Sequence, residues 1–426
     1  MPTSVIPYIP ETIVVHLGAP TQSAANVTVP FTDYVKNVVS SEIYPTWEPA
    51  ALEANTLAII SFALNRFYTE YYRSRGYDFD ITSSTAIDQK YIEGRNIYEN
   101  ISVLVDEIFD RYLRREGFVE PLAAKFCNGV TTTCDGLSQW GSQYLAEGGA
   151  DAFSILRSYY GNVELVTNAP VQEPSPSYPG TPLRRGDTNA DVALIQFILN
   201  RISQNYPAIP KLTVDGVFGP ATEASVRAFQ SIFDLTADGI VGPATWYKMI
   251  LLYVAVQRLS ELQSLGQTYT RYNWELPEPL SIGSTGSRVT FLQYVLSVLA
   301  QFISSIPEAN ITGTYSENTE EAVRAFQSYA GLPVTGSIDD ATWNALYAQY
   351  SAIRSEVLSS GELFPITQSD APEAVPVFAN AQAPAPSILS QPPTGDAAQR
   401  YSDTSRFLQY PAGGFAAGQQ DEEGSL

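Results

Sequence analysis

Hydrophobic residues recur at helical spacing from the first third of the chain onward. In residues 33–47 (DYVKNVVSSEIYPTW), Val35, Val38 and Val39 share one helical face with Glu42, and Pro45 ends the pattern. Residues 48–64 are apolar on most sides, with Pro49 in the first turn, which predicts a second helix packed beneath the first. A carboxyl group on a buried face loses solvation, which raises its pKa and suits it to act as a general acid.

Period-two alternation predicts strands around these helices. Residues 11–18 and 26–29 are expected to form the first two strands, and 77–82 a third. Residues 97–115 carry a helical stripe and are expected to form one helix. His16 lies among valines in the first strand and is interpreted as a structural residue. The first part of the chain is therefore predicted to be a mixed α+β domain.

The second half contains an internal repeat with a fixed offset. Residues of the same type recur 97 positions apart, in the pairs Leu183 and Leu280, Gly216 and Gly313, Phe229 and Phe326, and Trp246 and Trp343. Each copy has a core-spaced helix, a glycine-containing turn, a second helix, another turn and a third helix. The repeat predicts two small all-α modules of three helices, each about 70 residues long.

Composition divides the chain into five segments. We expect a mixed α+β domain over 10–165, a proline-rich linker over 166–181, the first repeat over 182–265, the second over 279–360, and a disordered tail over 365–426. The protein is thus expected to be multidomain, with a core in each folded segment.

Charge and hydropathy exclude several classes of partner. The formal net charge is −21, so no basic surface is expected for nucleic acid. The N-terminus has neither the basic nor the apolar region of a signal peptide, and the longest apolar runs are too short to cross a bilayer. Two cysteines, Cys127 and Cys134, cannot form a disulfide framework.

Three motifs in the first domain resemble the stage II sporulation protein D family. They are the acid-containing segment 33–47 with its following helix, the short piece 88–91 (DQKY), and 137–149 (LSQWGSQYLAEGG) followed by 155–161 (ILRSYYG). The resemblance spans about 130 residues. It implies a domain that cleaves the glycan strands of peptidoglycan, as a lytic transglycosylase does.

Both repeats resemble the type 1 peptidoglycan-binding domain at their glycine, Val-Arg-Ala-Phe-Gln and Thr-Trp positions. The whole arrangement is similar to spore cortex-lytic proteins. It implies peptidoglycan glycan strands as the partner, tethered by two modules acting through avidity, and a location at the cell wall or in the spore.

The resemblance also nominates site residues. Glu42 is the candidate catalytic acid, and one carboxyl group suffices for a transglycosylase that closes an anhydro sugar. Candidates for substrate contact are the motif residues Tyr44, Trp47, Gln139 and Trp140. In the modules, exposed groups near the turns are expected to contact sugar, and the candidates are Asp215, Phe218, Tyr315 and Arg324.

Other chemistries were weighed against this one. A two-carboxylate hydrolase would need a partner acid about 5 to 10 Å from Glu42, for which Glu48, Asp80 and Asp88 are candidates. With one histidine in the chain, a histidine-ligated zinc amidase is improbable, and a cysteine peptidase using His16 has little support.

The chain departs from the resembling family in the loop before the third motif. Residues 124–136 (AKFCNGVTTTCDG) contain no histidine, although some relatives bind zinc there with cysteine and histidine. Cys127 and Cys134 could supply two zinc ligands, form a local disulfide, or remain two thiols. No other cofactor is expected.

Asn55 and Ile60 also differ from the residues common in the family, glutamine and arginine. These departures favour an alternative hypothesis, a non-catalytic peptidoglycan-binding scaffold.

Overall fold

The computed structural model describes residues 7–175, 177–260, 268–269, 274 and 276–359. The tail expected over 365–426 lies outside the described residues. The first domain is a mixture of helices and short strands, as predicted. In chain order its elements are β1 (Ile9–Pro10), β2 (Thr12–His16), β3 (Asn26–Pro30), α1 (Phe31–Glu42), α2 (Pro49–Tyr68), η1 (Arg73–Arg75), β4 (Ile81–Thr82), α3 (Glu99–Ile108), β5 (Tyr112–Arg115), β6 (Phe126–Cys127), β7 (Thr132–Thr133), β8 (Leu137–Ser138), α4 (Gln139–Glu147), α5 (Ala152–Tyr160), β9 (Val163–Val166) and β10 (Val171–Gln172).

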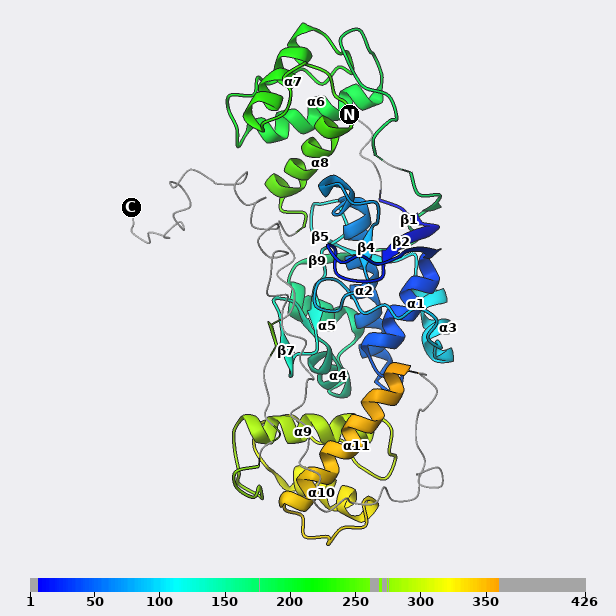
Figure 1. The fold of residues 1–426 in the computed structure, drawn as a ribbon, viewed down its shortest axis with the longest axis vertical. Coiled ribbons are helices and arrows are strands. Elements are labelled where there is room, and N and C mark those ends of the chain that lie inside the picture. Colours follow the sequence, from blue (N-terminus) through cyan, green and yellow to red (C-terminus); the bar gives the residue numbers. More distant parts are fainter. Residues whose placement is uncertain (1–6, 176, 261–267, 270–273, 275, 360–426) are drawn as a thin grey trace, which may run out of the picture. The chain divides into compact units, whose positions relative to one another are not determined.

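Helix α2 is the centre of the first domain. It is buried on nearly every side, and it contacts α1, α3, α4 and α5 (Figure 1). Helix α1 buries Val35, Val38 and Val39 against it, as the spacing predicts. Burying a valine or leucine side chain contributes roughly 1.5–3 kcal/mol, so this interface supplies much of the domain's stability.

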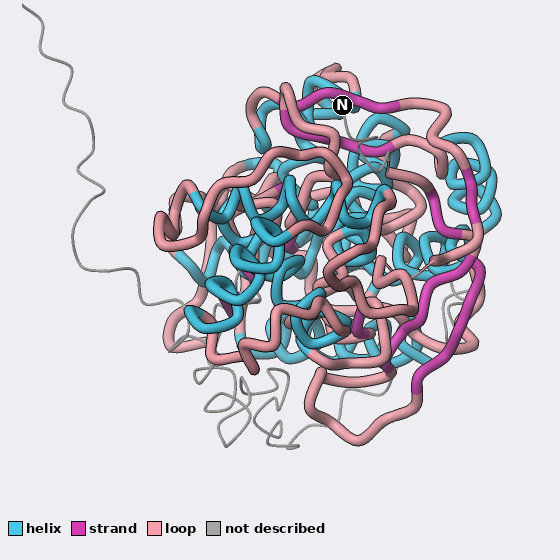
Figure 2. Tube along the Cα trace, turned by 90° about the horizontal axis from the view of Figure 1, so that it is seen from above, coloured by secondary structure: helices cyan, strands magenta, loops and turns pink. Residues whose placement is uncertain are grey.

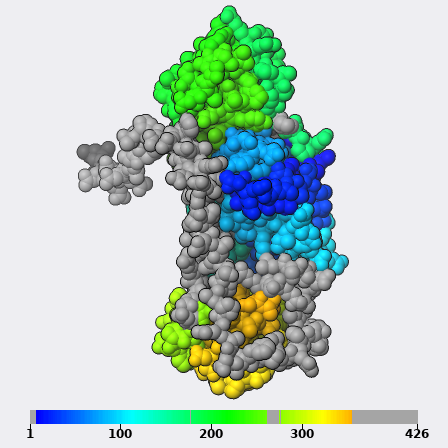
Figure 3. Space-filling model, in the orientation of Figure 1, coloured from blue at the N-terminus to red at the C-terminus, as the bar shows by residue number. Residues whose placement is uncertain are grey.

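A three-stranded sheet, ordered β3-β2-β4, leads into α1. Strand β2 pairs antiparallel with β3 and parallel with β4. His16 ends β2, where its Nδ1 lies 2.7 Å from Asn26 Oδ1 and its ring stacks on Phe79. These contacts agree with the structural role predicted for His16. In Figure 3 the N-terminal residues (dark blue), which include β2 and β3, lie at the surface beside the segment from about residue 85 to 110 (cyan).

Two sequence predictions in this domain were wrong in extent. The single helix expected over 97–115 is a shorter helix, α3, followed by β5, because Tyr112–Arg115 pair antiparallel with β9. Of the strand expected over 77–82, only Ile81–Thr82 pair with β2. In both cases long-range pairing decided what the local pattern left open.

A buried ion pair fixes the segment between α2 and α3. Arg66 Nε donates to Asp88 Oδ1 at 2.9 Å, and neither side chain is exposed. Tyr72 Oη and the Thr82 amide and hydroxyl donate to the other oxygen of Asp88. Breaking a buried ion pair by removing one partner costs several kcal/mol, so this pair holds residues 88–91 in place.

The two repeats are three-helix modules, as predicted. The first consists of α6 (Ala190–Ser203), α7 (Pro220–Ile232) and α8 (Pro243–Gln257), and the second of α9 (Ser287–Ala300), α10 (Glu317–Tyr329) and α11 (Asp340–Ser359). A short strand, β11 (Thr268–Tyr269), pairs with β7. Figure 2 shows the helices in cyan joined by long loops in pink. Helix α8 ends at Gln257, and residues 258–260 are not helical.

A buried glutamine organises each turn of the repeats. Gln196 donates to the Val217 carbonyl and the Thr222 hydroxyl, and its Oε1 accepts from the amides of Asp215 and Gly216. Gln230, Gln293 and Gln327 hold the other three turns in the same way. Each module therefore contains two copies of one helix-and-turn unit.

No helix among the described residues is long and apolar enough to span a bilayer.

Candidate functional site

Glu42 is the last residue of α1, and two segments far away in the chain hold its carboxylate. The backbone amide of Lys90 donates to Oε1 at 2.7 Å, and Gln139 Nε2 donates to Oε2 at 3.3 Å. The side chain is half-buried. All three family-like motifs identified in the sequence therefore meet at one carboxyl group, which the two hydrogen bonds aim in one direction.

The electrostatics of this position favour a protonated acid. Burial raises the pKa of Glu42, and the charge and amide of Lys90 and the amide of Gln139 lower it in part. Desolvation is the largest contribution, so the net shift is upward. A raised pKa keeps a carboxyl group protonated closer to neutral pH, which a general acid requires.

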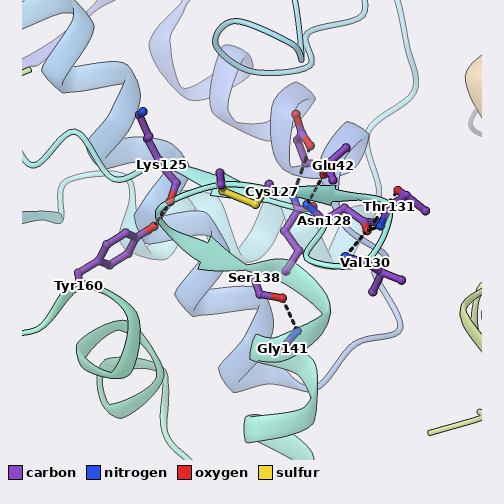
Figure 4. Close-up of a disulfide and its surroundings, with 12 residues drawn as sticks. Glu42, Lys125, Cys127, Asn128, Val130, Thr131, Ser138, Gly141 and Tyr160 are labelled. Carbon is purple, nitrogen blue, oxygen red and sulfur yellow. Dashed lines mark hydrogen bonds between the residues drawn. A yellow bond between two sulfur atoms is a disulfide. The ribbon is translucent and has the colours of Figure 1, made fainter. Parts of the chain in front are cut away.

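Residues 126–138, which form β6, a connecting loop and β8, lie beside Glu42 and position Gln139. Strand β6 pairs parallel with β8, and Ser138 caps α4 by accepting a hydrogen bond from the Gly141 amide at 3.0 Å. The Asn128 carbonyl accepts from the Trp140 amide, and the Asn128 side chain accepts from the amides of Val130 and Thr131. Figure 4 shows Glu42 facing the loop between β6 and β8. The first turn of α4, with Gln139 as its first residue, is thus fixed at both sides.

Cys127 and Cys134 form a disulfide across the loop between β6 and β8, with their Cα atoms 6.0 Å apart (Figure 4). Both sulfur atoms are bonded to each other, so neither is a thiolate that could bind a metal. The zinc alternative for this pair is therefore wrong for the structure described, and the local disulfide is the arrangement found. Among the described residues, no cluster of three or more histidine, cysteine, aspartate or glutamate residues could hold a metal ion.

An aromatic cluster adjoins the acid. The rings of Tyr44, Trp47 and Trp140 lie 5.1 to 5.8 Å apart in pairs. Trp47 and Trp140 are buried and Tyr44 is half-buried. The structure brings all four predicted contact residues, including Gln139, to the neighbourhood of Glu42. Tyr44 is therefore the most exposed of the three aromatic residues.

Residues of the second repeat close the far side of this cluster. The Phe302 ring packs edge-on at 5.8 Å from Tyr44, and the Tyr294 ring packs edge-on at 6.0 Å from Trp140. Thr46 donates a hydrogen bond to Gln301, and Tyr144 Oη accepts one from the Ile311 amide. These contacts are not evident from the sequence, because a repeat pattern does not indicate which surface of each copy packs against another domain.

Two of the other three candidate carboxylates, those of Asp80 and Asp88, are held in ion pairs. Asp88 is paired with Arg66, as described above, and Asp80 is paired with Arg73 and accepts a hydrogen bond from the Val14 amide. Both fix local structure. Glu48 is exposed at the start of α2, where its amide donates to Gln143. Asp80 and Asp88 are therefore poorly suited to be the second acid of a hydrolase.

Asn55 and Ile60, the two departures noted above, lie inside the core of the domain. Asn55 Nδ2 donates to Ser142 Oγ at 2.7 Å and thereby joins α2 to α4, and Ile60 is fully buried among apolar residues. Both therefore act through packing.

Two of the four residues nominated in the repeats are not accessible. Phe218 and Tyr315 were expected to be exposed, but both are buried, and Tyr315 Oη donates to the Gly336 carbonyl. They fill the module cores because their turns fold inward over the glutamines. Asp215 is exposed, but its carboxylate accepts hydrogen bonds from Gln196 and the Val217 amide. Arg324 is exposed and bonds Glu320 and the Val334 carbonyl.

The fold and site define a multidomain protein with one half-buried acid and a duplicated helical module. Comparison with known families agrees with this description. Residues 21–108 match the stage II sporulation protein family (SpoIID), and residues 188–249 and 285–346 each match the peptidoglycan-binding domain family (PG_binding_1). The arrangement expected from the sequence motifs is confirmed. No curated protein matches the chain. The family matches support association with peptidoglycan and a cell-wall function related to sporulation.

Proposed function

We propose that the protein cleaves peptidoglycan glycan strands as a lytic transglycosylase, with Glu42 as the general acid and base. The observation that carries this proposal is the setting of Glu42. It is a half-buried carboxyl group with a raised pKa, held by Lys90 and Gln139 beside an aromatic cluster. Such a group combines the two features that this reaction needs, a proton to donate and a fixed direction in which to donate it.

The chemistry requires only this one carboxyl group. Glu42 protonates the glycosidic oxygen between N-acetylmuramic acid and N-acetylglucosamine, and the bond from that oxygen to the anomeric carbon breaks. The C6 hydroxyl oxygen of the muramic acid then bonds to the anomeric carbon, and the Glu42 carboxylate accepts the proton of that hydroxyl. The product is an anhydro sugar, Glu42 regains its proton, and no water is consumed. Ion pairing of Asp80 and Asp88 supports a mechanism without a second acid.

The two modules serve as wall anchors in this proposal. A tether raises the local concentration of a polymer substrate around the attached site without any contact at the site itself. Glycan binding by Tyr44, Trp47, Gln139 and Trp140 belongs to the same proposal, as does binding by exposed module residues such as Asp215 and Arg324.

One observation favours a second function, a non-catalytic scaffold. Trp47 and Trp140 are buried, so less aromatic surface is exposed for a sugar than the motifs suggest. A scaffold would bind the wall through its modules and leave the glycan intact.

The two functions are separated by incubating the purified protein with intact and with peptide-stripped peptidoglycan, and then identifying soluble products by mass spectrometry. Anhydromuramyl products from the wild type, lost in Glu42→Gln but retained in Glu48→Gln, support the enzyme. Glu48 is the matched control because it is a nearby, exposed glutamate. Sedimentation with the wall and no product from either substrate would support the scaffold.

A further inference from the structure

The internal repeat allows one surface to be compared in two copies. Tyr294 and Phe302 of the second repeat correspond, 97 residues earlier, to Phe197 and Asn205 of the first. The register is confirmed by an aromatic pair found in both copies, Phe197 with Tyr253 and Tyr294 with Tyr350. The burial of equivalent positions can therefore be compared directly between the two repeats.

The two copies differ sharply in burial. Phe197 is 41% exposed and Asn205 is exposed, whereas Tyr294 is 7% exposed and Phe302 is 2% exposed. Gln204 is exposed, but its counterpart Gln301 is buried. The surface is open in the first repeat and covered in the second, where the aromatic cluster of the first domain lies against it.

The covered residues are linked to Glu42 through few steps. Phe302 packs on Tyr44, two residues beyond the acid. Tyr294 packs on Trp140, and Trp140 directly follows Gln139, which donates to the carboxylate. The Asn128 side chain accepts hydrogen bonds within the disulfide-closed loop between β6 and β8. It also donates to Tyr294 Oη at 3.5 Å.

We propose that the second repeat is a positioning part of the Glu42 site. Through Tyr294 and Phe302 it holds Tyr44, Trp140 and the start of α4 in the arrangement that binds the glycan strand. This inference rests on the proposed function, and it divides the work of the two repeats. The first repeat contacts the first domain at a different place, where Asn65 and Arg66 of α2 donate hydrogen bonds to Leu259 and Ser260 after α8. The second repeat helps to form the site at which the strand is bound and cleaved.

Rates on soluble, peptide-free glycan strands test the inference in the full-length protein. Tyr294→Ala and Phe302→Ala are expected to lower kcat/KM about tenfold or more, because the aromatic cluster loses its support. Phe197→Ala, the matched control in the first repeat, is expected to change kcat/KM less than twofold. Tyr294→Phe keeps the ring and is expected to retain most of the activity.

Two further readouts separate positioning from loss of folding. Thermal unfolding verifies that each variant is folded. Tyr144→Phe removes the hydrogen bond from the Ile311 amide without creating a core cavity. This variant is expected to lower kcat/KM by less than Tyr294→Ala does. If Tyr294→Ala displaces Gln139, the pKa of Glu42 rises further, and the high-pH limb of the rate profile moves to higher pH. Phe197→Ala should leave that limb in place.

The outcomes distinguish this inference from the proposed function. If the wild type releases no product, the proposed function fails, and binding of the same strands is then followed by tryptophan fluorescence. Weaker binding by Tyr294→Ala than by Phe197→Ala would still support a site built with the second repeat. Equal effects of these two variants, on rate or on binding, would overturn it.

Discussion

The Lys90 amide donates to the Glu42 carboxylate at 2.7 Å across 48 residues of chain. Lys90 lies two residues after Asp88, whose buried ion pair with Arg66 fixes this segment to α2. The segment 88–91 thus joins the core of the domain to the candidate acid. Only a change to proline would remove the backbone N–H of residue 90, so other substitutions there leave the donor to Glu42 in place.

The direction of the Glu42 pKa shift predicts the pH dependence of activity. As a general acid, Glu42 must be protonated, so the rate should fall as pH rises through its raised pKa. Gln139→Ala removes a hydrogen bond that lowers this pKa, and the fall should then occur at higher pH. Gln143→Ala is the matched control, since Gln143 is a buried glutamine of the same helix that bonds Glu48 and Glu147. Rates measured between pH 4 and 9 check this, and identical profiles for both variants would contradict it.

Glu308 predicts a pH dependence of stability. The pKa of Glu308 is raised from the ordinary 4.5 to about 7. Burial is the largest cause, Glu147 and Glu48 also raise the pKa, and the hydrogen bond from Gln301 lowers it. The neutral form is favoured in the folded protein, so the stabilisation is complete below about pH 4.5 and is lost as pH rises through about 7. Glu308→Gln should flatten the decline in melting temperature between pH 5 and 8.

Glu317→Gln, an exposed acid of the same repeat, should leave that decline unchanged. A parallel decline in wild type and Glu308→Gln would show that Glu308 does not carry the effect.

Reduction of the Cys127–Cys134 disulfide should weaken both folding and activity. Dithiothreitol supplies the two electrons and two protons that convert the bond to two thiols. The closed loop is short, so the expected loss of unfolding free energy is about 2 to 3 kcal/mol. Activity should fall because the loop between β6 and β8 holds the first turn of α4 and Gln139. Denaturant unfolding and product release with and without reductant measure both effects.

The double variant Cys127→Ser with Cys134→Ser is the control for that experiment. It should resemble the reduced wild type and should not respond to dithiothreitol. If dithiothreitol still changed the stability or activity of this variant, the redox effect would lie elsewhere. Full activity of the variant would exclude a positioning role for the loop between β6 and β8.

The glutamines of the repeats should each contribute to module stability. Gln293→Ala would leave the turn amides of Thr312 and Gly313 without their acceptor, and we expect a loss of about 1 to 3 kcal/mol. Gln196→Ala should act likewise in the first repeat, while Gln204→Ala, at an exposed position, should change stability by less than about 0.5 kcal/mol. Denaturant unfolding of the three variants provides the comparison.

Local patterns predicted much of this fold. Helices α1 and α2, the strands before them and the two three-helix repeats follow from hydrophobic spacing, turn residues and the 97-residue offset. The segment 97–115 was mispredicted because the strand at Tyr112–Arg115 depends on β9, about fifty residues away. A window of sequence contains no information on that partner.

The candidate site was predictable as a set of motifs, and its geometry was not. The motifs identified Glu42, Gln139 and the segment containing Lys90, but the use of the Lys90 amide depends on how the backbone folds. Phe218 and Tyr315 were predicted to be exposed and to contact sugar, but both are buried. Aromatic residues near a turn fit either a core or a sugar-binding surface. Only the packing of the turn decided between the two.

The measurement that tests the central claim most directly is cleavage of peptide-stripped glycan strands in water enriched in oxygen-18, read by mass spectrometry. A transglycosylase that uses Glu42 alone predicts an anhydromuramyl end with no heavy oxygen, and no such product from Glu42→Gln. Heavy oxygen at a new reducing end would contradict the account, because it would show that water attacks the anomeric carbon and that a second group activates it.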